Sequence, residues 1–353
     1  MPSIPDEKGD PTINRFFKYE YVVVTYNMET PLIIETKGLS KTFSYKSKEG
    51  KKVVAAVKGV DLAVRKGEIF GFLGPNGAGK STTQKMLSTL LSPTGGEAKI
   101  AGFDLSKEPE KIRKTLGYVS QAGGTDGQST GIENLILQAR LYGLDTATAD
   151  KYAKEFIKRF QMESFIERPA ASYSGGQKRR LDVALGMIHH PKVLLLDEPT
   201  TGLDPQSRAY LWEEIRKLKA DGVTIFLTTH YMDEADKLCD EIAIIDNGQI
   251  VAKGTPSELK SSIGADRVEL GFSTQEASNE AMTLLKEKIK PTAINNTGNL
   301  VQLYVKNGES MLPEILRTLD SKKTCVQNVT LSKPSLDDVF LKYTGRSLRE
   351  DAQ

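Results

Sequence analysis

The sequence predicts an α/β fold, in which a mostly parallel β-sheet carries helices on both faces and a small α+β domain follows. Short apolar runs alternate with helical segments from residue 31 to about residue 260, and this alternation is typical of a parallel sheet. The most apolar runs, residues 193–196 and 242–245, have the continuous pattern of strands buried on both faces. After residue 260 two strand–helix–strand units follow within about 70 residues, which predicts the smaller domain.

The length and charge of the chain fit two folded domains and an extension. At roughly 100–200 residues per domain, 353 residues suggest two domains. We therefore divide the chain into an N-terminal extension (residues 1–30), an α/β domain (31–260) and a C-terminal α+β domain (261–353). The net charge of only +2 argues against a protein that binds nucleic acid through bulk positive charge.

Cysteine content and hydropathy indicate the compartment. Two cysteines are too few for a disulfide framework and are expected to be reduced thiols. No stretch approaches the roughly 18 apolar residues that a membrane-spanning helix needs. We therefore expect a cytoplasmic protein, in which any membrane function depends on a separate polypeptide.

The individual elements follow from local patterns. Residues 242–253 read IAIIDNGQIVAK, and the central Asp-Asn-Gly predicts a two-stranded hairpin. Period-2 or continuous apolar patterns predict strands at residues 19–26, 68–73, 223–227, 267–272, 300–305 and 326–331. Helical spacing of apolar residues predicts helices at 82–91, 276–289 and 311–319, and a last helix that points Leu336, Val339 and Phe340 inward.

A phosphate-binding loop follows the strand at residues 68–73. Its pattern is Gly, four residues, Gly, Lys, Ser, and the glycines allow consecutive backbone N–H groups to point at an anion. Lys80 can reach the β- and γ-phosphates of a nucleotide, and the Ser81 hydroxyl can bind Mg²⁺. The helix that begins near Gly79 adds the positive end of its dipole. The candidate nucleotide-binding residues are Gly74, Pro75, Asn76, Gly77, Ala78, Gly79, Lys80, Ser81 and Thr82.

Two strand ends carry the candidate catalytic groups. Asp197 and Glu198 end a buried strand, and ligands bind at the carboxyl ends of parallel strands. We expect Asp197 near Mg²⁺ and Glu198 as the general base that polarises the attacking water. His230 ends another such strand and is a candidate sensor of the γ-phosphate.

The order of these motifs resembles that of the ATP-binding-cassette (ABC) family, over about residues 31–259. Besides the phosphate loop, Asp197-Glu198 and His230, the chain carries the segment Tyr173-Ser174-Gly175-Gly176-Gln177, which resembles the family signature. Gln121 matches the family's switch glutamine, and Asp204 ends a Gly-Leu-Asp motif in the family order. The resemblance implies a P-loop cassette with a helical signature subdomain.

The resemblance also implies how the cassette works. Two copies would enclose two ATP molecules head to tail, so that Ser174, Gly175, Gly176 and Gln177 face the γ-phosphate bound by the partner. Gln121 would contact Mg²⁺ and the γ-phosphate, beside Ser81 and Asp197. Phe43 resembles the aromatic residue that stacks on adenine, with Tyr45 as an alternative. The implied cofactors are ATP and Mg²⁺. The implied partner is a second copy of the chain, and no nucleic-acid partner is implied.

Two segments are similar to a narrower group, the daunorubicin-resistance (DrrA-like) export ATPases. These are residues 229–235, THYMDEA, and the ending SLDDVFLKYTG at residues 335–345. This resemblance implies an ABC-2-type export system, in which the cassette drives a separate transmembrane permease from the cytoplasmic face of the membrane. In that group the small C-terminal domain is regulatory.

Two alternatives remain open at this stage: an importer ATPase, and a soluble ABC ATPase that acts on DNA or ribosomes. Only 94 residues separate Lys80 from Ser174, too few for the long coiled coil of chromosome-type members. A second phosphate loop, which translation-type members usually carry, is absent from the sequence. Both observations favour the export subunit.

Overall fold

The structure is a computed structural model that describes residues 30–47, 50–264, 266–322 and 324–344, without the side chains of residues 45, 47 and 51. The predicted strand at residues 19–26 and most of the N-terminal extension lie outside these residues. Within the described part, no helix is both long and apolar enough to cross a membrane.

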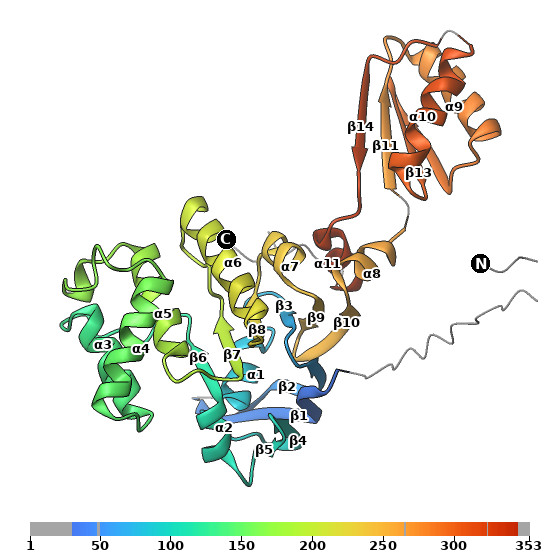
Figure 1. The fold of residues 1–353 in the computed structure, drawn as a ribbon. Coiled ribbons are helices and arrows are strands. Elements are labelled where there is room, and N and C mark those ends of the chain that lie inside the picture. Colours follow the sequence, from blue (N-terminus) through green and yellow to red (C-terminus); the bar gives the residue numbers. More distant parts are fainter. Residues whose placement is uncertain (1–29, 48–49, 265, 323, 345–353) are drawn as a thin grey trace, which may run out of the picture. The chain divides into compact units, whose positions relative to one another are not determined.

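A six-stranded sheet forms the centre of the α/β part (Figure 1). Its strand order is β10-β9-β3-β8-β7-β6, and every neighbouring pair is parallel except β9 with β10. The strands are β3 (Ile69–Leu73), β6 (Leu116–Val119), β7 (Val193–Asp197), β8 (Thr224–Thr229), β9 (Glu241–Asp246) and β10 (Gln249–Gly254). The predicted hairpin is confirmed: β9 and β10 are joined by Asn247 and Gly248, which both have positive φ, at 48° and 80°.

Both faces of this sheet are buried, which explains the continuous apolar runs. Along β3, Ile69 and Leu73 point into one core, while Phe70 and Phe72 point into another. The first core is closed by the helices α5 (Gly175–Met187), α6 (Pro205–Ala220) and α7 (Met232–Leu238). It continues into α3 (Gly131–Leu141) and α4 (Thr146–Arg159), the helical group that leads to the signature segment.

The second core is closed in a way that we did not predict. It packs α1 (Lys80–Leu87) and a separate antiparallel sheet, of order β2-β1-β4-β5, against the central sheet. The strands are β1 (Leu32–Ser47), β2 (Gly50–Arg65), β4 (Gly95–Ile100) and β5 (Phe103–Asp104), and α2 (Pro109–Thr115) follows them. The register of β1 and β2 shifts at several points, which breaks the period-2 pattern by which such strands are recognised.

The C-terminal unit is a four-stranded antiparallel sheet with two helices. The chain runs through β11 (Asp266–Gly271), α9 (Gln275–Lys288), β12 (Ala293–Thr297), β13 (Leu300–Val305), α10 (Gly308–Asp320) and β14 (Asn328–Ser332). The strand order β12-β13-β11-β14 is that of a split βαβ fold, and Val268, Leu270, Val301 and Leu303 point into its own core. The sequence pattern missed β12, whose residues AINNT combine two asparagines with partial exposure.

The last helix differs from the expectation that residues 261–353 hold a core of their own. The helix α11 (Leu336–Thr344) packs against α7, β10 and α8 (Pro256–Ser261). Its residues Leu336, Val339 and Phe340 are 2%, 0% and 0% exposed and belong to the core of the α/β part. Lys342 also donates a hydrogen bond to the carbonyl of Ser262, at 2.7 Å. The predicted inward face is therefore confirmed, and the core that receives it is that of the α/β part.

This packing predicts different outcomes for two deletions. Replacing residues 266–333 with a short Gly/Ser linker keeps α11, and we expect an unchanged thermal midpoint and unchanged nucleotide binding. Deleting residues 266–353 also removes the buried side chains of α11, and losing one such aromatic side chain alone costs about 3–5 kcal/mol. Thermal denaturation and binding of a fluorescent ATP analogue measure both effects. Equal stability of the two deletion proteins would contradict the assignment of α11 to this core.

Candidate functional site

The loop between β3 and α1 has the geometry of an anion-binding loop. Gly77 and Gly79 adopt φ values of 78° and 106°, which only glycine adopts without strain. A side chain at Gly79 would also place its Cβ 2.6 Å from the carbonyl oxygen of Ala56. Two backbone hydrogen bonds fix the loop, from Gly74 to the carbonyl of Thr229 and from Gly248 to the carbonyl of Ala78. The loop is thus held from the end of β8 and from the β9–β10 turn.

Lys80 is buried with its ammonium group turned over the loop. Its side chain is 4% exposed, and Nζ donates to the carbonyl oxygens of Gly74 at 2.7 Å and Pro75 at 3.0 Å. It also forms an ion pair with Glu198, with Nζ 3.3 Å from Oε1. Burial lowers the pKa of Lys80, against the opposing effect of Glu198 and Asp197. All partners of this cation are oxygen atoms, so phosphate oxygens fit the same place.

Glu198 is the point at which the predicted catalytic residues meet. Oε2 lies 3.2 Å from Nδ1 of His230 and accepts a hydrogen bond of 3.2 Å from Nε2 of Gln121. Thr201 donates to the same oxygen at 3.3 Å. Glu198 also has a φ of 44°, a conformation that costs a non-glycine residue about 1–3 kcal/mol and is concentrated at functional sites.

The charge state of Glu198 follows from these contacts. Burial by itself would raise its pKa, but the nearby His230 and the charge of Lys80 outweigh burial and lower the pKa to about 2. Glu198 is therefore a carboxylate at neutral pH. Because its pKa is depressed, the stability that it contributes is present above pH 4.5 and is lost as the pH falls toward 2.

Asp197 and Ser81 supply the oxygen atoms that Mg²⁺ prefers. Their side-chain oxygens lie 3.2 Å apart, and Thr228 fixes the carboxylate by donating to Oδ1 at 2.6 Å. The amide of Gln121 donates its N–H to Glu198, which leaves its carbonyl oxygen free to bind a cation. In the described part of the chain, no three His, Cys, Asp or Glu side chains gather into a metal site. The residues present therefore fit a cation whose remaining ligands are phosphate oxygens and water.

Three contributing residues were missed by the sequence reasoning. Thr228 and Thr201 orient the two carboxylates, and nothing in a Thr at a strand or loop end distinguishes such a role. Arg179 is 7% exposed and donates to three backbone carbonyls, those of Ser120, Asp197 and Pro199, at 2.9, 3.1 and 2.7 Å. It thereby joins the signature helix α5 to the segments that carry Gln121 and Glu198.

The signature residues lie at the surface, next to the loop that ends in Asp204. Ser174 caps α5 through a hydrogen bond with the backbone of Gln177, and Ser174 and Gly175 are exposed. A Cβ at Gly176 would collide with Oγ of Ser207, whose hydroxyl donates to Asp204 at 2.6 Å. Asp204 itself is the N-cap of α6, and its hydrogen bonds with Ser207 lower its pKa. Among the residues that the structure describes, these signature residues make no hydrogen bond or ion-pair contact with the phosphate loop of the same chain.

Phe43 lies on the antiparallel sheet beside the phosphate loop. It pairs with Val54 of β2, two residues before Ala56, whose carbonyl adjoins Gly79. Its ring is 38% exposed and has the ammonium group of Lys41 above it at 5.4 Å. This exposed ring is available for stacking. The side chain of the alternative, Tyr45, lies outside the described residues.

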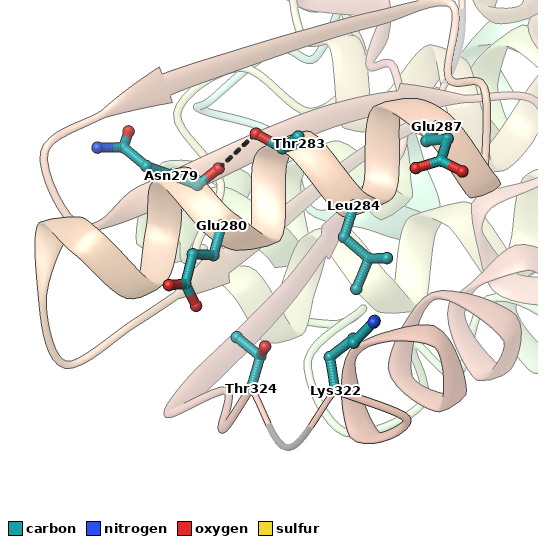
Figure 2. Close-up of a pocket in the computed structure, with 7 residues that line it drawn as sticks. All are labelled: Asn279, Glu280, Thr283, Leu284, Glu287, Lys322 and Thr324. Carbon is teal, nitrogen blue, oxygen red and sulfur yellow. Dashed lines mark hydrogen bonds between the residues drawn. The ribbon is translucent and has the colours of Figure 1, made fainter.

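The C-terminal unit has a surface hollow of its own, about 530 Å³ in volume (Figure 2). Glu280 and Leu284 of α9 point toward Lys322 and Thr324 across it. Its lining contains none of the motif residues, so it is separate from the candidate nucleotide site.

Comparisons with known proteins agree with this geometry. The family profile described as ABC transporter matches residues 57–201, and that of the ATP-binding protein DrrA1-3-like C-terminal domain matches residues 254–344. The chain is 41% identical to the daunorubicin/doxorubicin resistance ATP-binding protein DrrA of Streptomyces peucetius, over 93% of this chain and 98% of the relative. It is 36% identical to the Nod factor export ATP-binding protein I of Ralstonia nicotianae, over 90% and 95% of the two chains.

Solved structures lead to the same family. An ATP-binding cassette solved as a dimer in a post-hydrolysis state with ADP and Pi is 28% identical, with a TM-score of 0.57 over 63% of this chain and 98% of its own. An ATP-binding subunit of an ABC transporter is 31% identical, with a TM-score of 0.57 over 65% and 92%. The loop geometry, the two profiles and the extent of these similarities establish that the chain is a nucleotide-binding ATPase of the ATP-binding-cassette family, in its DrrA-like group of ATP-binding proteins.

Proposed function

We propose that this chain is the ATPase subunit of an ABC-2-type export system and that it drives a separate membrane permease. The observation that carries the proposal is the convergence of Lys80, Asp197 and Glu198 at one edge of the sheet. The names of its relatives, which include resistance and Nod factor export proteins, support the export direction. The substrate would be selected by the permease.

Residues of this chain bind the phosphates and activate the water for ATP hydrolysis. Lys80 exchanges its loop carbonyls and Glu198 for the β- and γ-phosphates of ATP. Ser81, Asp197 and Gln121 would hold Mg²⁺, which neutralises charge on the phosphates when bound. Glu198, released from Lys80, accepts a proton from the water that attacks the γ-phosphorus, while the bond from the γ-phosphorus to the β–γ bridging oxygen breaks and ADP leaves. His230 and Gln121 keep that carboxylate oriented, and Phe43 stacks on the adenine.

A second copy completes each site. Ser174, Gly175 and Gly176 lie at the exposed start of α5, where backbone N–H groups and the helix dipole favour a phosphate. Since their contacts described here do not reach the phosphate loop of their own chain, we infer that they face the γ-phosphate on a partner chain. ATP would therefore close a homodimer, and hydrolysis would reopen it.

A groove lined by α2, β6, the end of α3 and the segment after α1 is the proposed docking place of the permease. It has a volume of about 580 Å³ and combines exposed leucines with charged side chains. Leu90 and Leu141 are 64% and 73% exposed there, beside Arg113 and Glu110. Exposed apolar side chains rimmed by charges are typical of a protein interface. Docking here would hold the chain at the cytoplasmic face of the membrane through protein contacts.

Co-fractionation tests this function. We expect the chain to move to the membrane fraction only when it is expressed together with its permease partner. Leu141→Asp should lower the membrane-bound share at least about tenfold, because it buries a charge in the interface. Leu137→Asp is the matched control, since Leu137 is 56% exposed on the same helix but does not line the groove. Membrane association without that partner, or equal loss with both substitutions, would contradict the proposal.

We propose that residues 31–260 together with α11 form the cassette, and that the rest of the predicted domain 261–353 is the regulatory unit. Residues 266–332 form a unit with its own core, whereas α11 returns to the cassette. We propose that this unit modulates closure of the dimer. The deletion that keeps α11 isolates that effect, because ATP binding by the monomer should persist while dimer stability changes.

A further inference from the structure

A buried acid outside the described mechanism lies four residues after His230. Glu234 in α7 is 0% exposed, and its Oε1 accepts a hydrogen bond of 3.0 Å from the indole nitrogen of Trp212 in α6. Burial raises the pKa of Glu234, against the opposing effect of the neighbouring Thr229, Trp212 and Thr200. An acid in such a place needs a reason, because a buried polar group is costly unless it is hydrogen-bonded.

The surroundings of Glu234 indicate what it binds. Its second oxygen, Oε2, and the hydroxyl of Thr200 are both buried, and neither has a hydrogen-bond partner among the residues that the structure describes. The Thr200 hydroxyl lies beside this carboxyl. A hydrogen bond from the Thr200 hydroxyl to Oε2 would satisfy both atoms at once. Glu234 thus joins three segments: α6, the loop after Glu198, and the end of β8.

Two of these segments carry the catalytic pair. Thr200 stands two residues after Glu198, and its neighbour Thr201 donates to Oε2 of Glu198. Thr229 precedes His230, and its hydroxyl accepts a hydrogen bond from the backbone of Tyr231 at 2.9 Å. The backbone of Glu198 is strained, so the surrounding contacts must hold it in place.

We propose that Glu234, anchored by Trp212, is a positioning residue that fixes Glu198 and His230 relative to each other. It acts through the loop after Glu198 and the end of β8, which it holds at the spacing at which Nδ1 of His230 meets Oε2 of Glu198. The inference rests on the proposed roles of Glu198 and His230. We call Glu234 with its neighbours Trp212, Thr200 and Thr229 the clamp. If the clamp is lost, we expect kcat to fall without loss of nucleotide affinity.

Three variants test the clamp in the full chain. Glu234→Met keeps the volume but removes both oxygens, and we expect kcat for ATP hydrolysis to fall about 10- to 100-fold, the cost of misplacing a reacting group by about 1 Å. KM and the dissociation constant of a fluorescent ATP analogue should stay within about twofold. Glu234→Gln preserves one acceptor for Trp212 and one donor for Thr200, so it should restore kcat to within about threefold of the unmodified chain. Trp212→Phe removes the donor together with part of the ring system and should lower kcat in the same direction as Glu234→Met.

The tryptophan supplies an independent readout, since the chain contains only one. Its fluorescence emission should shift in Glu234→Met, which loses the acceptor, and not in Glu234→Gln. An unchanged kcat in Glu234→Met would overturn the proposal, and so would a loss of kcat matched by an equal loss of affinity. An equal loss of kcat in Glu234→Gln and Glu234→Met would overturn it as well. If Glu234→Met does not fold, Trp212→Phe decides: a kcat equal to that of the unmodified chain rejects the clamp.

A parallel Glu198→Gln measurement separates this proposal from the proposed function. Turnover by Glu198→Gln at the unmodified rate would reject the general-base role itself, whatever the Glu234 variants do. If turnover collapses in Glu198→Gln but Glu234→Met hydrolyses ATP at the unmodified rate, only the clamp is rejected.

Discussion

Glu198→Gln is expected to lower ATP turnover by about 10²- to 10⁴-fold, the usual contribution of a general base. The substitution preserves the size of the side chain and its ability to hydrogen-bond, but it removes the carboxylate that takes the proton from water. Nucleotide binding should survive, because Lys80 and the phosphate loop are untouched. Single-turnover hydrolysis and equilibrium binding of a fluorescent ATP analogue measure the two effects separately.

The same variant should trap a closed dimer. With ATP bound and hydrolysis blocked, the step that reopens the dimer is missing, so size-exclusion chromatography with ATP and Mg²⁺ should show a species of twice the mass. Glu213→Gln is the control for removal of a glutamate charge, since Glu213 is exposed on α6. Hydrolysis by Glu198→Gln at the rate of this control would reject the general-base role.

The low pKa of Glu198 explains why the proposed general base would be weakly basic until a nucleotide binds. In the structure its pKa is about 2, partly because Lys80 lies 3.3 Å away. A base works best when its pKa lies near the working pH. Moving Lys80 to the phosphates removes one of the contacts that lower this pKa, so nucleotide binding itself would raise the basicity of Glu198. The strained backbone at Glu198 fits such a two-state role.

The site was more predictable from sequence than the packing around it. The phosphate loop, Asp197-Glu198 and His230 could be identified because each stands at the carboxyl end of an apolar strand, and parallel pairing brings these ends to one edge. The Asn247-Gly248 turn could be predicted equally well, because two consecutive positive φ values favour such residues.

The elements that were missed either lack a regular local pattern or pack against parts of the chain that are distant in sequence. The antiparallel sheet of β1, β2, β4 and β5 has register shifts that blur its alternation. The helix α11 has an obvious apolar face, but periodicity does not say which core receives it. Likewise, the roles of Thr228, Arg179 and Glu234 follow from contacts that arise only after the chain has folded.

Gly175→Asp is expected to abolish ATP hydrolysis while ATP still binds to the monomer. It places a carboxylate at the start of α5, against the γ-phosphate of the partner chain, where like-charge repulsion in a desolvated interface costs several kcal/mol. Gly175 suits this test better than Gly176, because its Cβ would meet only Leu203 at 3.9 Å, whereas that of Gly176 would collide with Ser207. An acidic residue in the first turn also favours the helix dipole, so α5 should stay folded.

Mixing this variant with Lys80→Ala tests the composite site directly. Lys80→Ala removes the cation from the β- and γ-phosphates, and we expect its ATP affinity to fall about 10- to 100-fold, as for loss of a charged hydrogen bond. Neither variant alone should hydrolyse ATP at a useful rate. In a heterodimer, one site combines the intact phosphate loop of the Gly175→Asp chain with the intact signature of the Lys80→Ala chain, so activity should return to as much as half per dimer. Heterodimers are verified by pull-down through a tag on one variant. A verified heterodimer without activity would mean that phosphate loop and signature do not act across the two chains, and it would leave the exposed position of Ser174 and Gly175 without a functional reason.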